Sequence, residues 1–191
     1  MNTENVILPS NEEMQNVFEM SQNQYKKEIS HYEMLVKEKP ELAHLFAETL
    51  NEEASTSPVL NLTESVNGYF NINTFYQYGY YPFIQVSSYP VIIGNEQNVG
   101  KRTHFNGYVH GGYNQIPQVS INNVHLSGVV RHAQTIINAS LNFQVFINPK
   151  NIVLRLYRGN VYLGDLFSVY QSNLFVTHPL VLSGVGSFTL I

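Results

Sequence analysis

The chain has no cysteine and no tryptophan among its 191 residues. The absence of cysteine excludes a disulfide framework, a thiolate nucleophile and thiolate metal ligands. No apolar run approaches the roughly 20 residues that a membrane-spanning helix needs. The first residues also lack a basic stretch followed by an apolar one. We therefore expect no transmembrane segment and no signal peptide. The sequence does not indicate in which cellular compartment the protein works.

Carboxylates are scarce in most of the chain. Twelve of the 13 glutamates precede residue 65, and only Glu96 and Asp165 follow it. Glycoside hydrolysis uses two carboxyl groups at one bond, and calcium or magnesium sites use several oxygen anions. We therefore expect a protein that is not an enzyme and binds no cofactor. For Asp165 the pattern predicts a turn or an ion pair with Arg155 or Arg158.

The charge is divided unevenly along the sequence. Twelve glutamates and four lysines give residues 1–64 a net charge of −8, whereas residues 65–191 carry +4. Such a split is typical of a solvated acidic helix attached to a low-charge domain. An alternative is that the two parts, or two subunits, attract each other electrostatically. The basic residues are few and scattered, so we do not expect nucleic-acid binding.

Residues 11–38 have the pattern of an amphipathic helix. Apolar and tyrosine side chains recur mostly at spacings of three, four and seven, and Glu12 and Glu13 suit a first turn. This stripe either packs on its own domain or forms a seam for a second copy or a partner. The candidate helix-interface residues are Met14, Phe18, Tyr25, Ile29, Tyr32 and Leu35.

A polar segment, residues 51–58, separates the helical part from the rest of the chain. We predict a helical amino-terminal segment with its linker at 1–57 and an antiparallel β domain at 58–191. A second, shorter helix is predicted at 41–50. From residue 59 onward apolar and polar side chains alternate, as they do in half-buried strands.

Residues 141–167 predict three strands joined by two short turns. Pro149 and Lys150 form the first turn, and Gly159 and Asn160 form the second. Other strands are predicted at 59–63, 65–72, 74–80, 83–87, 91–93, 104–110, 118–126, 129–137, 168–176 and 185–191. Many short strands at near-even spacing are typical of a sandwich, a jelly roll or a barrel, and we predict an antiparallel β-sandwich or jelly roll.

Histidine and tyrosine supply the candidate ligand or interface residues. Tyrosines gather at residues 75–83, and histidines and tyrosines at 104–113. Tyrosine suits wet recognition surfaces, although the same rings can stabilise a sheet by cross-strand pairing. No zinc-binding motif accompanies the histidines, so no metal site is predicted. The candidates are Tyr76, Tyr78, Tyr80, Tyr81, His104, Tyr108, His110 and Tyr113.

These observations favour a non-catalytic structural protein. We expect a homo-oligomer that self-associates through neutral strands rich in tyrosine and asparagine, with the helix as an anchor or packing arm. A virion, a phage particle or a cell-surface assembly is the expected setting. The alternatives are a lectin-like module that binds a glycan or protein receptor and a β-pore-forming toxin.

Overall fold

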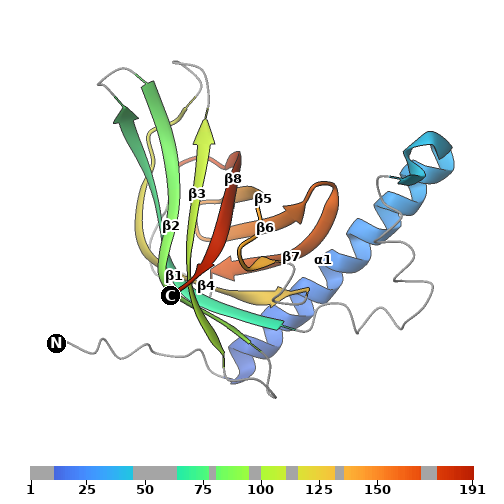
Figure 1. The fold of residues 1–191 in the computed structure, drawn as a ribbon, viewed down its shortest axis with the longest axis horizontal. Coiled ribbons are helices and arrows are strands. Elements are labelled where there is room, and N and C mark those ends of the chain that lie inside the picture. Colours follow the sequence, from blue (N-terminus) through green and yellow to red (C-terminus); the bar gives the residue numbers. More distant parts are fainter. Residues whose placement is uncertain are drawn as a thin grey trace.

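The structure is a computed structural model that describes residues 11–44, 64–77, 81–94, 100–110, 116–131, 136–168 and 176–191. Within these ranges it has one α-helix, one short 3-10 helix and eight strands (Figure 1). The elements are α1 (Asn11–Glu38), η1 (Pro40–Leu42), β1 (Glu64–Gln77), β2 (Tyr81–Gly94), β3 (Lys101–His110), β4 (Ser120–Val130), β5 (Leu141–Ile147), β6 (Ile152–Arg158), β7 (Val161–Ser168) and β8 (Leu180–Leu190).

The eight strands close into one antiparallel barrel. Their order around the barrel is β1-β2-β3-β8-β5-β6-β7-β4, and β4 pairs with β1 to complete the circle. Each run of four sequential strands has the 4-1-2-3 order of a Greek key, and the two Greek keys meet at the β3–β8 and β7–β4 pairs. The prediction of a β-sandwich or jelly roll is therefore wrong.

Alternation of side chains could not distinguish these architectures, because strands of a sandwich and of a barrel share a period of two. Closure depends on long, bent strands. Both β1 and β2 have 14 residues, and each spans two of the shorter predicted strands. A register shift between Gly68 and Phe70 interrupts the β1–β2 ladder, and another between Ser87 and Val91 interrupts the β2–β3 ladder. Bulges of this kind let a strand turn from one side of a barrel to another.

The three predicted strands of residues 141–167 are confirmed as β5, β6 and β7. The backbone N–H of Asn148 donates to the carbonyl oxygen of Asn151 at 2.8 Å across the Pro149 turn. Gly159 has φ +60° in the second turn, a conformation that glycine adopts without steric cost. These three strands and β8 form the second Greek key.

The barrel interior is filled by apolar side chains rather than by solvent. In β5 and β6 alternate residues are fully buried, from Leu141 to Ile147 and from Ile152 to Leu156. The rings of Phe143 and Phe188 lie 5.7 and 4.8 Å from the ring of Phe105. A barrel of eight strands has an interior of the size that side chains can fill.

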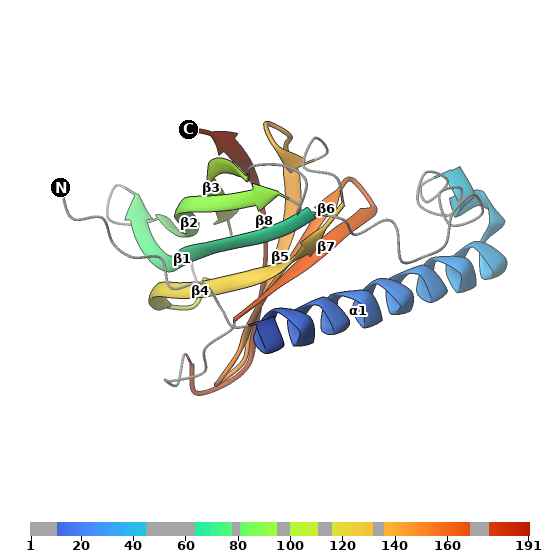
Figure 2. The same cartoon turned by 90° about the horizontal axis from the view of Figure 1, so that it is seen from below.

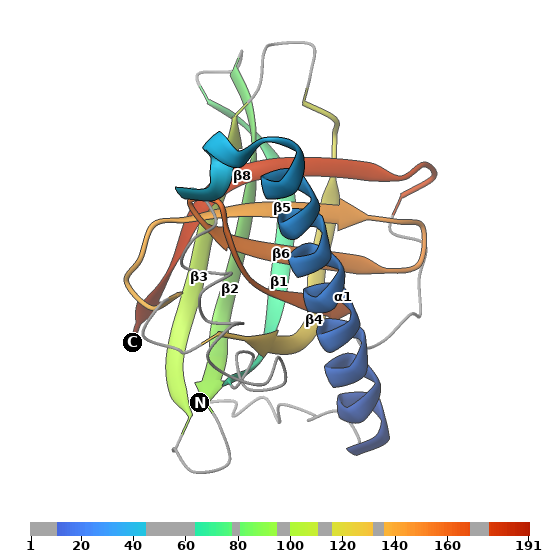
Figure 3. The same cartoon turned by 90° about the vertical axis from the view of Figure 1, so that its right-hand side faces the viewer.

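Helix α1 is confirmed at Asn11–Glu38 and lies against the outside of β4 and β7. Figure 2 shows the helix along this side of the barrel, with β2 and β3 on the far side. Figure 3 looks onto the helix from outside. Because the helix covers them, β4 from Val124 and β7 from Tyr162 are buried on both faces.

Several predicted segments lie wholly or partly outside the described residues. They are the linker at 51–58, the strand at 59–63, most of the strand at 168–176, the end of the strand at 74–80 and residues 132–135 of the strand at 129–137. Of the second predicted helix the structure describes only its start, which is the 3-10 turn Pro40–Leu42 and the two residues after it.

Candidate functional site

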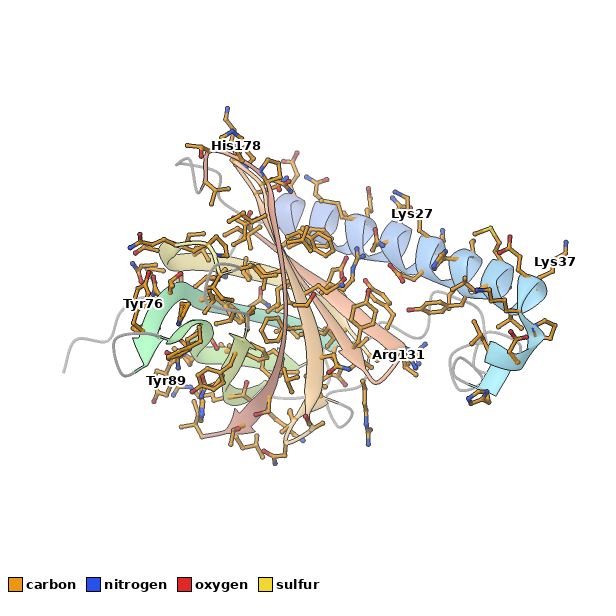
Figure 4. The ribbon with its side chains drawn as sticks, turned by 90° about the horizontal axis from the view of Figure 1, so that it is seen from above. Lys27, Lys37, Tyr76, Tyr89, Arg131 and His178 are labelled. Carbon is orange, nitrogen blue, oxygen red and sulfur yellow. The ribbon has the colours of Figure 1, made fainter. Side chains whose placement is uncertain are left out.

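The outer face of β1, β2, β3 and β8 is not covered by the helix. Eight of the ten large apolar or tyrosine side chains that are exposed in the described chain belong to these strands or to Ile191 after them. Figure 4 shows Tyr76 and Tyr89 away from the helix that carries Lys27 and Lys37. Exposed apolar side chains that gather on one face often mark a binding or assembly site.

Four side chains form a diagonal row across this face, which we call the aromatic stripe: Phe75, Phe83, Tyr108 and Val185. The rings of Phe75 and Phe83 stack with their centroids 5.8 Å apart. The ring of Tyr108 lies 5.9 Å from that of Phe83, and Tyr108 pairs with Val185 in the β3–β8 ladder. Phe75 is 45% exposed, Tyr108 36% and Val185 52%. The stripe therefore joins four strands into one apolar surface.

Amide side chains border the stripe and fix Tyr108 in place. The Nε2 of Gln85 donates to Oδ1 of Asn106 at 2.9 Å, and Nδ2 of Asn106 donates to the Tyr108 hydroxyl at 3.0 Å. Further along the same face, Nδ2 of Asn73 donates to Oδ1 of Asn122 at 2.8 Å. These bonds hold long side chains in single conformations, which lowers the entropy cost of binding something to them.

A hollow of about 570 Å³ lies beside the stripe, between β3, β8 and residues 138–140. We call it the β3–β8 hollow. Tyr108 and Val185 form its border with the stripe. Its polar lining consists of His104, Asn106, Asn138, Ser140, Ser187 and Thr189.

A second groove, of about 590 Å³, separates α1 from the outside of β5 and β8. The helix contributes Glu28, His31 and Leu35, and the barrel contributes Asn142 and Tyr157 among others. Val185 lines this groove as well as the hollow.

The predicted ligand residues divide into three groups. Tyr76 is exposed near the end of β1, and His104 and Tyr108 both line the β3–β8 hollow. For Tyr81 and His110 the structure describes the strand positions but not the side chains. The remaining candidates, Tyr78, Tyr80 and Tyr113, lie outside the described residues.

The predicted helix-interface residues that the structure describes face the chain's own barrel. Ile29 and Tyr32 are buried with Val129 and Tyr162, and Leu35 packs against the same cluster. Nothing is described of the side chains of Met14, Phe18 and Tyr25. From Ile29 to Leu35 the apolar side of α1 therefore packs on the chain's own β domain.

A partly buried ionic network joins the helix to the barrel. Nε and Nη2 of Arg155 donate to the two carboxylate oxygens of Asp165 at 2.9 and 3.1 Å, and Nη1 donates to Glu28 at 3.1 Å. The expected ion pair of Asp165 with Arg155 is confirmed. The Glu28 bond is one contact of the kind that the alternative interpretation, attraction between the acidic helical part and the β domain, predicts.

Burial and charge pairing together set the pKa values of this network. It raises the pKa of Asp165, although the hydrogen bonds and the charge of Arg155 act in the opposite direction. Burial alone would lower the pKa of Arg155, but its hydrogen bonds to Asp165 and the nearby negative charges outweigh that effect and raise it. Burial, followed by nearby carboxylates, also raises the pKa of Tyr32, Tyr157 and Tyr162.

The network has the geometry of a structural contact, because it joins α1 to β6 and β7. Asp165 is fully buried beneath the helix, and the second late carboxylate, Glu96, lies outside the described residues. Across the described chain, no three His, Cys, Asp or Glu side chains come close enough to hold a metal ion.

Sequence reasoning missed part of the surface. Phe75 and Phe83 bound the tyrosine-rich segment but were not selected, and Asn106 lies between two selected residues. Val185 gave no signal, because β8 carries apolar residues on both faces. Only the β3–β8 pairing places Val185 beside Tyr108.

Comparisons with protein families, with curated proteins and with solved structures find no match to this chain. Among the helices that the structure describes, none has both the length and the apolar composition needed to cross a membrane.

Proposed function

We propose that the protein is a non-catalytic structural module that self-associates through the aromatic stripe and the strands around it. The observation that carries this proposal is the gathering of exposed apolar and tyrosine side chains on β1, β2, β3 and β8. Interface cores are enriched in tyrosine and phenylalanine and depleted in charged residues.

The charges of these strands agree with such a role. Neither β2 nor β8 contains a charged residue. In β1 the only charged residue is Glu64, which is buried, and in β3 the charges of Lys101 and Arg102 lie at the strand start. The centre of the face is therefore neutral, so a second copy would meet it without burying an unpaired charge.

Closure of the barrel favours association through a sheet face. An open sheet can grow by adding strands at its edges, whereas each strand of this barrel has two neighbouring strands. Self-association through the exposed side chains of β1, β2, β3 and β8 needs no free strand edge. The described apolar face of α1 is already packed on its own barrel, which leaves the opposite side as the surface for a second copy.

Size-exclusion chromatography with light scattering, at tens of micromolar protein, tests the proposal. The wild type is expected to be an oligomer, and Phe75→Glu is expected to shift it towards monomer, because a carboxylate would be buried without a partner. Met34→Glu is the matched control, since Met34 is 51% exposed on α1 against 45% for Phe75. A wild type that remains monomeric throughout would refute the proposal.

A further inference from the structure

The β3–β8 hollow differs from the aromatic stripe in its chemistry. Apart from Ala139 and Gly186, the residues that line it are its six polar side chains and the bordering Tyr108 and Val185. None of these lining residues is Asp, Glu, Lys or Arg. Without a permanently charged side chain, the hollow has little to balance the charge of an ionic ligand, so its chemistry favours a neutral ligand.

The polar groups of the hollow can both donate and accept hydrogen bonds. The lining contains two asparagine amides, three hydroxyls of Ser140, Ser187 and Thr189, and the imidazole of His104. Hydroxyl and amide groups each offer donors and acceptors. A ligand whose own groups do the same, such as the hydroxyls of a sugar, can satisfy this lining from several directions.

The rim of the hollow is held rigidly to the barrel. Ile136 is fully buried, Ile137 forms a β-bridge with Phe188, and the backbone N–H of Asn138 donates to the carbonyl oxygen of Phe188 at 2.7 Å. Asn138 itself has φ +57°, a left-handed conformation that asparagine tolerates better than most residues. Residues that are held in sparsely populated backbone conformations, as Asn138 is at this rim, concentrate at binding sites.

The opposite wall is also preorganised. Asn106 uses one acceptor for Gln85 and one amide hydrogen for Tyr108. An amide has two acceptor positions and two hydrogens, so one of each stays available within the hydrogen bonds of the described chain. The ring of Tyr108 lies next to these groups at the border of the hollow and offers a flat apolar surface.

We propose that the β3–β8 hollow is a binding site for a neutral saccharide. Its volume of about 570 Å³ lies inside the usual range of small-ligand sites, roughly 300–1,000 Å³. The apolar face of a sugar ring would lie against Tyr108, while its hydroxyls would bond Asn106, Ser187 and Thr189. This activity goes beyond self-association. Because Tyr108 and Val185 belong to both surfaces, a second copy seated on the stripe would compete with the saccharide for Tyr108.

Titration of isotope-labelled protein, followed by amide NMR, tests this site. The probes are glucose, galactose and N-acetylglucosamine, each also as a β-linked disaccharide. Binding is expected to shift resonances of β3, β8 and residues 138–140. The double variant Ser187→Ala, Thr189→Val is expected to bind on the order of ten-fold more weakly or worse, because it removes two hydrogen-bonding hydroxyls from the hollow.

Two controls separate the possible results. Ser120→Ala removes an exposed serine hydroxyl outside the hollow, on β4, and is expected to leave affinity unchanged. Phe75→Glu, designed to abolish self-association, is expected to keep saccharide binding because Phe75 does not line the hollow. The proposal is overturned if no probe shifts any resonance, or if the shifts avoid β3 and β8.

Discussion

Arg155 and Asp165 face each other across β6 and β7 and share two hydrogen bonds of 2.9 and 3.1 Å. This bidentate pair lies beneath the helix, where Asp165 is fully buried. The guanidinium carbon of Arg155 is also 5.1 Å from the centre of the Phe146 ring and 5.9 Å from that of Tyr162. Its third bond, to Glu28, adds a polar link between barrel and helix to the apolar packing of α1.

Replacing Arg155 by leucine is expected to destabilise the protein by about 3–5 kcal/mol at neutral pH. The substitution leaves the buried carboxylate of Asp165 without its partner, which is the costly way to break a buried ion pair. The free energy of unfolding, measured in urea, checks this. Arg158→Leu is the control: Arg158 is exposed on the same strand, so its loss is expected to cost less than about 0.5 kcal/mol.

The same variant has a predictable pH dependence. Without Arg155 the pKa of Asp165 is raised further by burial, so the folded protein holds a proton that the unfolded chain releases above about pH 4. The loss of stability is therefore largest at neutral pH and shrinks as the pH falls towards 4. A loss that is constant over this range would show that the charge of Asp165 is not its cause.

The helix is expected to owe its position to a few buried side chains. Ile29→Ala should cost about 2–5 kcal/mol, because it removes a buried side chain from the cluster that includes Val129 and Tyr162. Met34→Ala is the control, since that side chain is half exposed. Urea denaturation gives both values. Equal effects of the two substitutions would contradict the observed packing of α1.

Local sequence signals predicted the elements well where turn residues punctuate them. The three strands β5, β6 and β7 could be predicted, because Pro149 and Gly159 each favour a turn at one position. The helix bounds could be predicted from the apolar pattern of residues 11–38. The closed barrel could not, since the β3–β8 and β1–β4 pairs join residues far apart in sequence. Strand pairing at that range depends on the whole fold rather than on local pattern.

The candidate surface was predicted in part for the same reason. Tyrosine composition selected Tyr76 and Tyr108, which the structure places on the uncovered side of the barrel. Their neighbours were not selected, because Val185 reaches Tyr108 only through the β3–β8 ladder. The hollow also needs residues 138–140, which were assigned no role in the sequence.

Alkaline pH is expected to unfold the protein through its buried tyrosines. Burial raises the pKa of Tyr32, Tyr157 and Tyr162 above the ordinary value near 10. The unfolded chain then releases protons that the folded chain retains, so stability is present below about pH 10 and is lost as the pH rises above it. Each such tyrosine can contribute a slope of up to about 1.4 kcal/mol per pH unit.

Ultraviolet absorbance of tyrosinate, recorded with circular dichroism, measures this effect. Three of the 13 tyrosines are expected to ionise together with unfolding rather than before it. Tyr32→Phe should reduce the slope, whereas Tyr76→Phe, at an exposed position outside the network, should not. Complete ionisation of all tyrosines in folded protein would contradict the burial of these side chains.

Gly128 is expected to be essential for closing the barrel between β4 and β7. A Cβ atom at this position would overlap the backbone carbonyl oxygen of Asp165 and lie 2.9 Å from Cα of Leu166. The neighbouring backbone cannot yield without breaking the β4–β7 ladder, so Gly128→Ala should cost about 3 kcal/mol or more. Amide hydrogen exchange should also accelerate in β4 and β7, the strands that this pair joins.

Gly159 supplies the comparison that separates steric overlap from backbone conformation. No atom lies within 4 Å of a Cβ built at Gly159, and its only constraint is φ +60°. Gly159→Asn should therefore cost only a few tenths of a kcal/mol, because asparagine adopts the left-handed region readily. If Gly128→Ala and Gly159→Asn lowered the free energy of unfolding equally, the close approach of β4 and β7 at Gly128 would be contradicted.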